Sequence, residues 1–335
     1  MNNQKPGRVR AAVTAVGHYV PEKIMTNADF EKIVDTTDEW ILTRTGIRER
    51  RILEHGATSD LGAKAIEQML KNRGIGAEEI DVIILASVTP DMFFPSTACI
   101  IQDKIGAKKA WGFDLSAACS GFLYALVMGS QLIETGAYNK VVVVGADKMS
   151  SIVDYTDRNT CILFGDAGAA VLLEPANDDS VGIFDHKLYA DGSGGSYLYM
   201  KGGGSLHPPT HETIENKMHY LYQDGKSVFK VAVLGMADVS AEIMKRNNLT
   251  GNDVDYLVPH QANLRIIDAC RARMGIDPSK VMINIERYGN TTAATIPLCL
   301  SEWWQAGKLK RGSTLVLSSF GAGYTWGAVL LRWAF

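Results

Sequence analysis

The stretch FDLSAACSGFLYAL, residues 113–126, joins a strand-like apolar run to a helix-like apolar run and carries Cys119 at the junction. From Phe122 to Ile133 the sequence leaves almost no polar stripe, and a helix that is apolar on every side is buried inside a protein. Cys119 would therefore lie at the N-terminal end of a central helix, where unpaired N–H groups and the helix dipole favour an anion such as a thiolate. A small cysteine that merely packs in the core is the alternative.

Short β-branched runs alternate with longer helix-like patterns along the chain. The runs are apolar without alternation, as expected of strands that helices cover on both faces. They are DVIILAS (81–87), KVVVVGAD (140–147), DYLVPH (255–260) and STLVLSS (313–319). The pattern predicts a layered α/β fold.

A weak internal sequence repeat suggests that this fold is duplicated. KVVVVGAD is followed by FGDAGAAVLLE (164–174), and STLVLSS by FGAGYTWGAVLLR (320–332), so each pair reads as strand, glycine-rich turn and strand. We therefore expect an N-terminal half over residues 1–175 and a C-terminal half over 231–335. The segment between them, 176–230, is expected to form connecting loops that frame a ligand entrance, or a solvated linker.

The composition is that of an ordinary globular protein. The 335 residues are 46% hydrophobic and 21% charged, and the formal net charge of −3 gives no whole-molecule attraction to nucleic acid or to an anionic membrane. The 5 cysteines are few, odd in number and widely spread, as in a reducing compartment. Because neither a secretory signal nor a run of about 18 apolar residues is visible, we expect a cytoplasmic protein.

A nucleophilic cysteine needs groups that manage charge on a reacting carbonyl, and three later positions are candidates. His260 ends an apolar run before a helical pattern, a frequent place for active-site residues in α/β sheets, although a structural histidine fits equally well. Asn290 follows Gly289 and either caps a turn or enters the site. Ala322 lies in a glycine-rich turn that either aims a backbone N–H into a cavity, as an oxyanion hole does, or is a plain hairpin.

Motifs for nucleotides and metals are missing from the sequence. Neither GxxxxGK[ST] nor a GxGxxG that opens a helix after a strand occurs, and there is no HExxH or CxxC. We therefore expect no metal site and no external cofactor.

Four short segments together resemble the active-site signatures of β-ketoacyl-acyl-carrier-protein synthase III, a condensing enzyme of the thiolase fold. They are DLSAACSGF (114–122), PHQANLRII (259–267), YGNTTAA (288–294) and FGAGYTWG (320–327). Three more segments are similar, namely DEWILTRTGIRER (38–50), FFPSTACIIQ (93–102) and RNTCILFGDAGAAVLL (158–173). The resemblance covers essentially the whole chain in order, and it implies two related βαβαβαββ halves packed as a five-layered αβαβα core.

The resemblance also implies catalytic roles for particular residues. Cys119 matches the nucleophile, and His260 and Asn290 match its two partners. The backbone N–H groups of Cys119 and Ala322 match the oxyanion hole. Many relatives carry glycine in place of Ala322, and the N–H survives that difference provided that the turn does not need positive φ.

Binding roles follow in the same way. The positions that match contacts to coenzyme A are Trp40, Arg44, Arg158 and Asn263. The positions that match the surface for acyl carrier protein are Gln261, Arg265 and Arg273. Phe94 matches a residue that reaches the acyl pocket of a neighbouring subunit, which implies a homodimer.

The reaction implied by the resemblance has two halves. A short acyl group passes from acyl-coenzyme A to Cys119, and malonyl-acyl carrier protein then loses CO2 and attacks it, giving 3-ketoacyl-acyl carrier protein at the start of type II fatty acid synthesis. Neutral His260 and the Asn290 amide would donate hydrogen bonds to the enolate oxygen, which a carboxylate would repel. The starter acyl group cannot be read from the sequence.

Other readings use the same residues differently. A related condensing enzyme of a specialised polyketide or signalling pathway fits the same motifs. A cysteine hydrolase or thioesterase can share the order Cys, His, Asn, but AACSG lacks the C-G-[SA]-C-[WY] surround of papain-like proteases. A thiolase would place a second cysteine in the last glycine-rich turn, and a hydroxymethylglutaryl-type synthase would carry a glutamate between Trp111 and Leu132; neither is present. A carrier-binding subunit without catalysis would not need all three polar groups.

Overall fold

The first half of the protein is built on a five-stranded sheet. A computed structural model describes residues 9–335. The sheet has the order β1-β7-β6-β4-β5, in which β4 is parallel to β5 and β6, whereas β7 is antiparallel to β6 and β1. In chain order the elements are β1 (Ala11–Tyr19), α3 (Thr58–Arg73), β4 (Val82–Ala86), α4 (Thr97–Lys104), β5 (Trp111–Leu115), α5 (Gly121–Glu134), β6 (Val141–Asp147) and β7 (Ala167–Pro175).

The second half repeats this order. Its sheet runs β11-β12-β13-β8, with β11 parallel to β12 and with β13 antiparallel to β12 and β8. A parallel bridge from Leu257 to Val281 stands where the first half has β5. The elements are β8 (Gly182–Ala190), α7 (Gly225–Arg246), β11 (Tyr256–Pro259), α8 (Leu264–Met274), α10 (Thr295–Gln305), β12 (Thr314–Gly321) and β13 (Thr325–Arg332). The predicted duplication of a βαβαβαββ unit is therefore confirmed.

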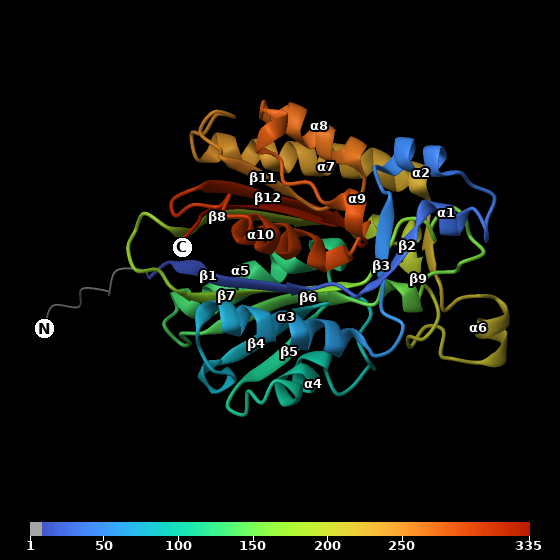
Figure 1. The fold of residues 1–335 in the computed structure, drawn as a ribbon, viewed down its shortest axis with the longest axis horizontal. Coiled ribbons are helices and arrows are strands. Elements are labelled where there is room, and N and C mark those ends of the chain that lie inside the picture. The colour runs from blue at the N-terminus through green and yellow to red at the C-terminus, as the bar shows by residue number, and fades with distance from the viewer. Residues whose placement is uncertain (1–8) are drawn as a thin grey trace, which may run out of the picture.

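The two sheets and their helices form five layers, as Figure 1 shows. Helix α3 packs on the outer face of the first sheet, and α7 packs on the outer face of the second. Helices α5 and α10 fill the space between the sheets, and α5 contacts strands of both. The helix that follows Cys119 is thus the central, buried helix that the sequence predicted.

Strand residues alternate between two apolar cores. In β4, Ile84 faces the central core with α5, whereas Ile83 and Leu85 face the outer core with α3. Both faces of the strand are buried, which explains why the sequence is apolar without alternation. In α5 itself, Phe122 is fully buried in the central core, which stabilises the fold by about 2 kcal/mol for a side chain of this size.

The boundary between the halves differs from the prediction. Residues 176–230 were expected to be connecting and entrance loops, but they contain β8, which pairs with β13 and opens the second half, and the start of α7. Strand β8 lies at the edge of its sheet, and most of its residues are only half-buried, so it lacks the continuous apolar run of the central strands.

Small elements cover one end of both sheets. Between β1 and α3 lie β2 (Lys23–Thr26), α1 (Asn27–Phe30), α2 (Asp38–Thr45) and β3 (Glu49–Ile52). Between β8 and α7 lie β9 (Leu198–Met200), α6 (His211–Glu215) and β10 (Leu221–Gln223), and α9 (Ile285–Tyr288) precedes α10. Among residues 9–335, no helix is long and apolar enough to cross a membrane.

Candidate active site

Cys119 lies in a tight turn between β5 and α5. The turn is a 3-10 segment, Ala118–Ser120, that runs directly into the first residue of α5. Ala118 has a φ of 47°, in the left-handed region that an L-residue enters at a cost of about 1–2 kcal/mol. The strained turn places Cys119 on the wall of a cavity of about 790 Å³.

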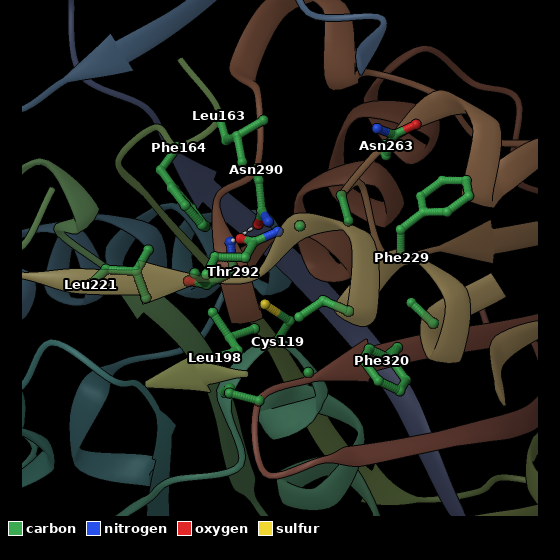
Figure 2. Close-up of a pocket in the computed structure, with 18 of the residues that line it drawn as sticks. Cys119, Leu163, Phe164, Leu198, Leu221, Phe229, Asn263, Asn290, Thr292 and Phe320 are labelled. Carbon is green, nitrogen blue, oxygen red and sulfur yellow. Dashed lines mark hydrogen bonds between the residues drawn. The ribbon is translucent and has the colours of Figure 1, made fainter. Parts of the chain in front are cut away.

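Three segments far apart in the sequence meet in this cavity, which is lined by Cys119, His260 and Asn290 together. His260 follows the end of β11, and its backbone N–H donates to the Ser318 carbonyl at 2.8 Å. Asn290 follows α9, and its backbone N–H donates to the Leu163 carbonyl at 2.9 Å. Figure 2 shows the Asn290 amide beside the sulfur of Cys119. The structure thus brings together the three side chains that the sequence singled out.

The imidazole of His260 is neutral. The residue is buried, and desolvation lowers its pKa to about 3. Its Nδ1 lies 2.8 Å from the Thr295 hydroxyl, which fixes the ring plane and leaves Nε2 as the nitrogen available to the cavity. A neutral imidazole can accept or donate one proton at Nε2, according to its tautomer.

The thiol of Cys119 is protonated at neutral pH. Desolvation raises its pKa to about 12, and the nearby charge of Asp147 acts in the same direction. Hydrogen bonds from the Cys119 N–H and from the Asn290 amide lower the pKa, but by less. We expected the helix N-terminus to favour a thiolate; burial outweighs it, so the proton must leave during the reaction.

A second turn brings Ala322 to the same cavity. Ala322 follows β12 and lines the cavity with Cys119. The Thr325 hydroxyl contacts the carbonyls of Ala117 and Ala322, at 2.9 and 3.1 Å, and so ties the two turns together. Positive φ at non-glycine positions occurs in residues 9–335 at Ala118, Lys217, Asn248 and Thr292 only. Alanine is therefore tolerated at position 322, and its N–H is retained.

The residues predicted to contact coenzyme A gather at the cavity mouth. The guanidinium groups of Arg44 and Arg158 lie over the Trp40 ring, at 4.8 and 4.9 Å from its centre. Arg158 also forms an ion pair of 3.2 Å with the exposed Asp35. Asn263 caps α8 and donates to the Arg44 carbonyl at 2.8 Å, which joins α8 to α2.

The residues predicted to contact acyl carrier protein lie in different settings. Arg265 lies at the mouth, with its guanidinium 4.7 Å from the centre of the Phe229 ring. Arg273 is exposed but forms an ion pair of 3.0 Å with Asp238.

The prediction for Gln261 is wrong, because this side chain is fully buried. Its amide nitrogen donates to the carbonyls of Pro259 and Met282. Its oxygen accepts from the backbone N–H groups of Asn284 and Ile285, where the preceding loop enters α9. Gln261 therefore braces this loop and cannot touch a docked protein.

Sequence reasoning missed two groups of residues around the site. Leu198 and Leu221, from the short strands β9 and β10, line the cavity, so the segment that we read as loops supplies part of its apolar wall. Thr292 and Thr295 support Asn290 and His260 through hydrogen bonds. Their position in the motif YGNTTAAT was visible, but nothing in the sequence says which way their hydroxyls point.

The fold and the cavity define a class of protein. A half-buried thiol beside a neutral imidazole, a carboxamide and two tight turns that can supply backbone N–H groups can accept an acyl group and stabilise an oxyanion. Placed between two duplicated α/β halves, this set indicates an acyl-transferring enzyme of the thiolase fold.

Comparisons with known proteins identify the family. The family described as 3-oxoacyl-[acyl-carrier-protein (ACP)] synthase III matches residues 113–192, and its C-terminal part matches residues 244–333. A β-ketoacyl-[acyl-carrier-protein] synthase III of Chlorobaculum tepidum is 60% identical over 97% of this chain and 100% of its own. The chain belongs to the 3-oxoacyl-[acyl-carrier-protein] synthase III family of acyltransferases.

Solved structures agree with this assignment. The crystal structure of 3-oxoacyl-[acyl-carrier-protein] synthase III from Aquifex aeolicus VF5 superposes with a TM-score of 0.90 at 41% identity, covering 96% of this chain and 100% of that one. The priming β-ketosynthase of the R1128 polyketide pathway also has a TM-score of 0.90, at 34% identity, covering 98% of each chain. The predicted thiolase-like fold is therefore confirmed.

Proposed function

We propose that the cavity at Cys119 carries out both halves of the family's reaction, in which an acyl group from acyl-coenzyme A is joined to malonyl-acyl carrier protein with loss of CO2. The observation that supports this most directly is the meeting of Cys119, His260 and Asn290 in one cavity. This condensation initiates fatty acid synthesis.

The first half-reaction transfers the acyl group to Cys119. As the sulfur attacks the thioester carbonyl, Nε2 of His260 takes the thiol proton, because a thiol with a pKa of about 12 is not ionised beforehand. The N–H groups of Cys119 and Ala322 hold the oxyanion, and one such donor is worth about 3 kcal/mol. The carbon–sulfur bond to coenzyme A then breaks, and the leaving thiolate takes the proton from His260.

The second half-reaction forms the carbon–carbon bond. The malonyl carboxylate leaves as CO2, and its electron pair moves into an enolate whose oxygen accepts hydrogen bonds from the Asn290 amide and from Nε2–H of His260. The Thr295 hydroxyl lies 2.8 Å from Nδ1 of His260 and 3.1 Å from the Thr292 carbonyl. It can therefore accept a hydrogen bond from Nδ1–H in one tautomer of the imidazole and donate one to Nδ1 in the other. The enolate carbon attacks the acyl carbonyl, and the released Cys119 sulfur takes up one proton.

Substrate entry follows from the side chains at the mouth. Trp40, Arg44 and Arg158 are suited to the adenine and phosphates of coenzyme A, since aromatic and guanidinium faces stack on bases and cations pair with phosphates. Arg265 offers one positive charge to an acidic carrier protein, whereas Arg273 is largely neutralised by Asp238.

We also propose that the enzyme is a homodimer. Strand β5 is the last strand of its sheet, and Trp111 on this strand is 43% exposed. Phe94 is 84% exposed, which suits a side chain that completes a neighbouring subunit's pocket. An apolar sheet edge of this kind is normally covered. Action in the cytoplasm stays a prediction.

Polyketide priming is a second candidate, favoured by the likeness to the R1128 ketosynthase. It would use the same chemistry with a different starter or carrier protein. Rates with several acyl-coenzymes A and with fatty-acid and polyketide carrier proteins separate the two pathways.

The proposed function is tested by following each half-reaction. Incubation with acetyl-coenzyme A should add one acetyl mass to the peptide that contains Cys119, and malonyl-acyl carrier protein should then remove it as 3-ketoacyl product. Cys119→Ala should abolish both signals, whereas Cys99→Ala, at an exposed cysteine, is the matched control and should retain them. Acyl mass on another residue, or release of free acid in place of ketoacyl product, would contradict the proposal.

A further inference from the structure

Thr292 occupies a strained and central position beside the catalytic groups. Its φ is 51°, which is unfavourable for a β-branched residue. Its backbone N–H donates to Oδ1 of Asn290 at 2.9 Å (Figure 2), and its carbonyl accepts from the Thr295 hydroxyl at 3.1 Å. Because the Thr295 hydroxyl also contacts Nδ1 of His260, the backbone of Thr292 supports both partners of Cys119.

A buried carboxyl group from the other half of the protein holds Thr292 in place. Asp147 ends β6 and is fully buried, and its Oδ2 accepts a hydrogen bond from the Thr292 hydroxyl. Its Oδ1 is fixed in turn by the hydroxyls of Ser87 and Thr89, both at 2.9 Å, and by the N–H groups of Val88 and Thr89, at 2.8 and 3.1 Å. The carboxyl group is thus immobile, and the Thr292 hydroxyl is anchored to a rigid point.

We propose that Asp147, acting through Thr292, is a positioning residue that holds Asn290 and His260 against Cys119. The inference rests on the proposed function, because it takes the roles of Asn290 and His260 from there. Asp147 does not line the cavity, so it touches no substrate. Its charge also raises the pKa of Cys119, but its contact with Asn290 and His260 runs through Thr292.

The geometry explains why this anchor matters for the second half-reaction. The Thr292 N–H can pair only with the oxygen of the Asn290 amide, which turns the NH2 group toward Cys119. Without the anchor, Thr292 can relax from its positive φ and release the amide. An Asn290 side chain that is free to flip can present its amide oxygen to the enolate. The partial negative charge of the amide oxygen would then repel the enolate oxygen.

Substitutions at Thr292 distinguish an effect on the positioning of the catalytic groups from an effect on the stability of the fold. Thr292→Val removes the hydroxyl but keeps the β-branch, Thr292→Ala removes the hydroxyl without added apolar bulk, and Thr292→Ser keeps the hydroxyl. We expect kcat for condensation to fall roughly 10- to 100-fold in the Val and Ala variants, with the KM for malonyl-acyl carrier protein changed less than about twofold. Thr292→Ser should stay within about threefold of the parent, since it retains the anchor.

The neighbouring residue provides a matched control. The Thr291 hydroxyl is buried and has no hydrogen-bond partner among the described residues, so Thr291→Val removes a buried hydroxyl without touching the anchor. Its rate should equal that of the parent. Each variant's melting temperature shows whether it is folded, and Thr292→Ala serves if Thr292→Val does not fold.

A double-mutant cycle shows whether Thr292 acts through the catalytic groups. In an Asn290→Ala background, Thr292→Val should cost much less than in the parent, because the group that it positions is gone. If Asn290→Ala condenses at the parent's rate, the proposed function fails. If Asn290→Ala loses activity but Thr292→Val and Thr292→Ala do not, or if Thr291→Val loses as much as they do, only the role of Asp147 and Thr292 is overturned.

Discussion

The backbone of Gly321 lies so close to that of Cys119 that a Cβ at position 321 would stand 2.7 Å from the Cys119 nitrogen. The glycine is needed for space, because it brings the turn after β12 against the turn before α5. One turn belongs to each half, the first between β5 and α5 and the second between β12 and β13, and the proposed oxyanion N–H groups belong to them. The proposed oxyanion hole would therefore be formed where the duplicated halves meet.

Gly321→Ala is expected to damage acyl transfer more than folding. The added methyl group must push the two turns apart, and the loss of one aligned oxyanion donor costs roughly 100-fold in rate. The rate of acetyl transfer to Cys119, measured by stopped-flow or quenched mass spectrometry, checks this. Gly195→Ala is the control, since a Cβ there meets nothing within 4 Å. Equal acylation rates in both variants would show that the Ala322 N–H does not stabilise the oxyanion.

The alkylation of Cys119 should depend steeply on pH. Only the thiolate reacts with iodoacetamide, and burial raises the pKa of Cys119 to about 12, so the reactive fraction grows about tenfold for each pH unit from 7 to 10. A small thiol with a pKa of about 8.5 levels off within this range and is the control. Alkylation of Cys119 followed by peptide mass should show no plateau below pH 10, and a plateau near pH 7 would mean that the helix terminus outweighs burial after all.

The central strands could be predicted because burial on both faces leaves a local signature. The runs 81–87, 140–147 and 255–260 contain β4, β6 and β11, and the run 313–319 covers most of β12. Strand β8, GIFDHKLYA, was missed because its edge position exposes part of both faces and admits Asp185, His186 and Lys187. The boundary of the second half was misplaced because this strand was missed, and the expected start at residue 231 also falls inside α7.

The supports of the site could not be predicted, because they depend on side-chain direction and on contacts between distant segments. Asp147 and Thr292 are 145 residues apart and meet only once the two halves pack. Gln261 stands next to His260 in a motif typical of a docking surface, yet it faces inward and binds backbone groups. Cys119, His260 and Asn290 were identified because the motifs that carry them resemble those of a known family, whereas periodicity alone left each with an ordinary structural alternative.

Arg158→Ala should weaken the binding of acyl-coenzyme A without slowing the reaction of substrate that is already bound. The guanidinium stacks on Trp40, and a contact of this type is worth about 0.5–2 kcal/mol, so we expect the KM for acetyl-coenzyme A to rise roughly 3- to 30-fold at unchanged kcat. Arg158→Lys keeps the charge beside Asp35 but loses the planar face. Its KM for acetyl-coenzyme A should therefore lie between those of the parent and of Arg158→Ala. Steady-state kinetics checks this, and an unchanged KM in Arg158→Ala would place the nucleotide elsewhere.

Trp111→Arg should convert the protein to a monomer. Trp111 stacks on Phe113 at 6.0 Å and lies beside Tyr138 at 5.6 Å, which makes an aromatic surface along the free edge of β5. A charge placed there has to be desolvated if a second sheet edge covers it, and this costs several kcal/mol. Sedimentation velocity should show a dimer for the parent and a monomer for Trp111→Arg, whereas Leu234→Arg, at an exposed leucine on α7, should stay dimeric. Because Phe94 is proposed to complete the neighbour's acyl pocket, the monomer should also lose acyl transfer to Cys119. A monomeric parent would refute the dimer, and a monomeric variant with full acyl transfer would show that each subunit's pocket is complete by itself.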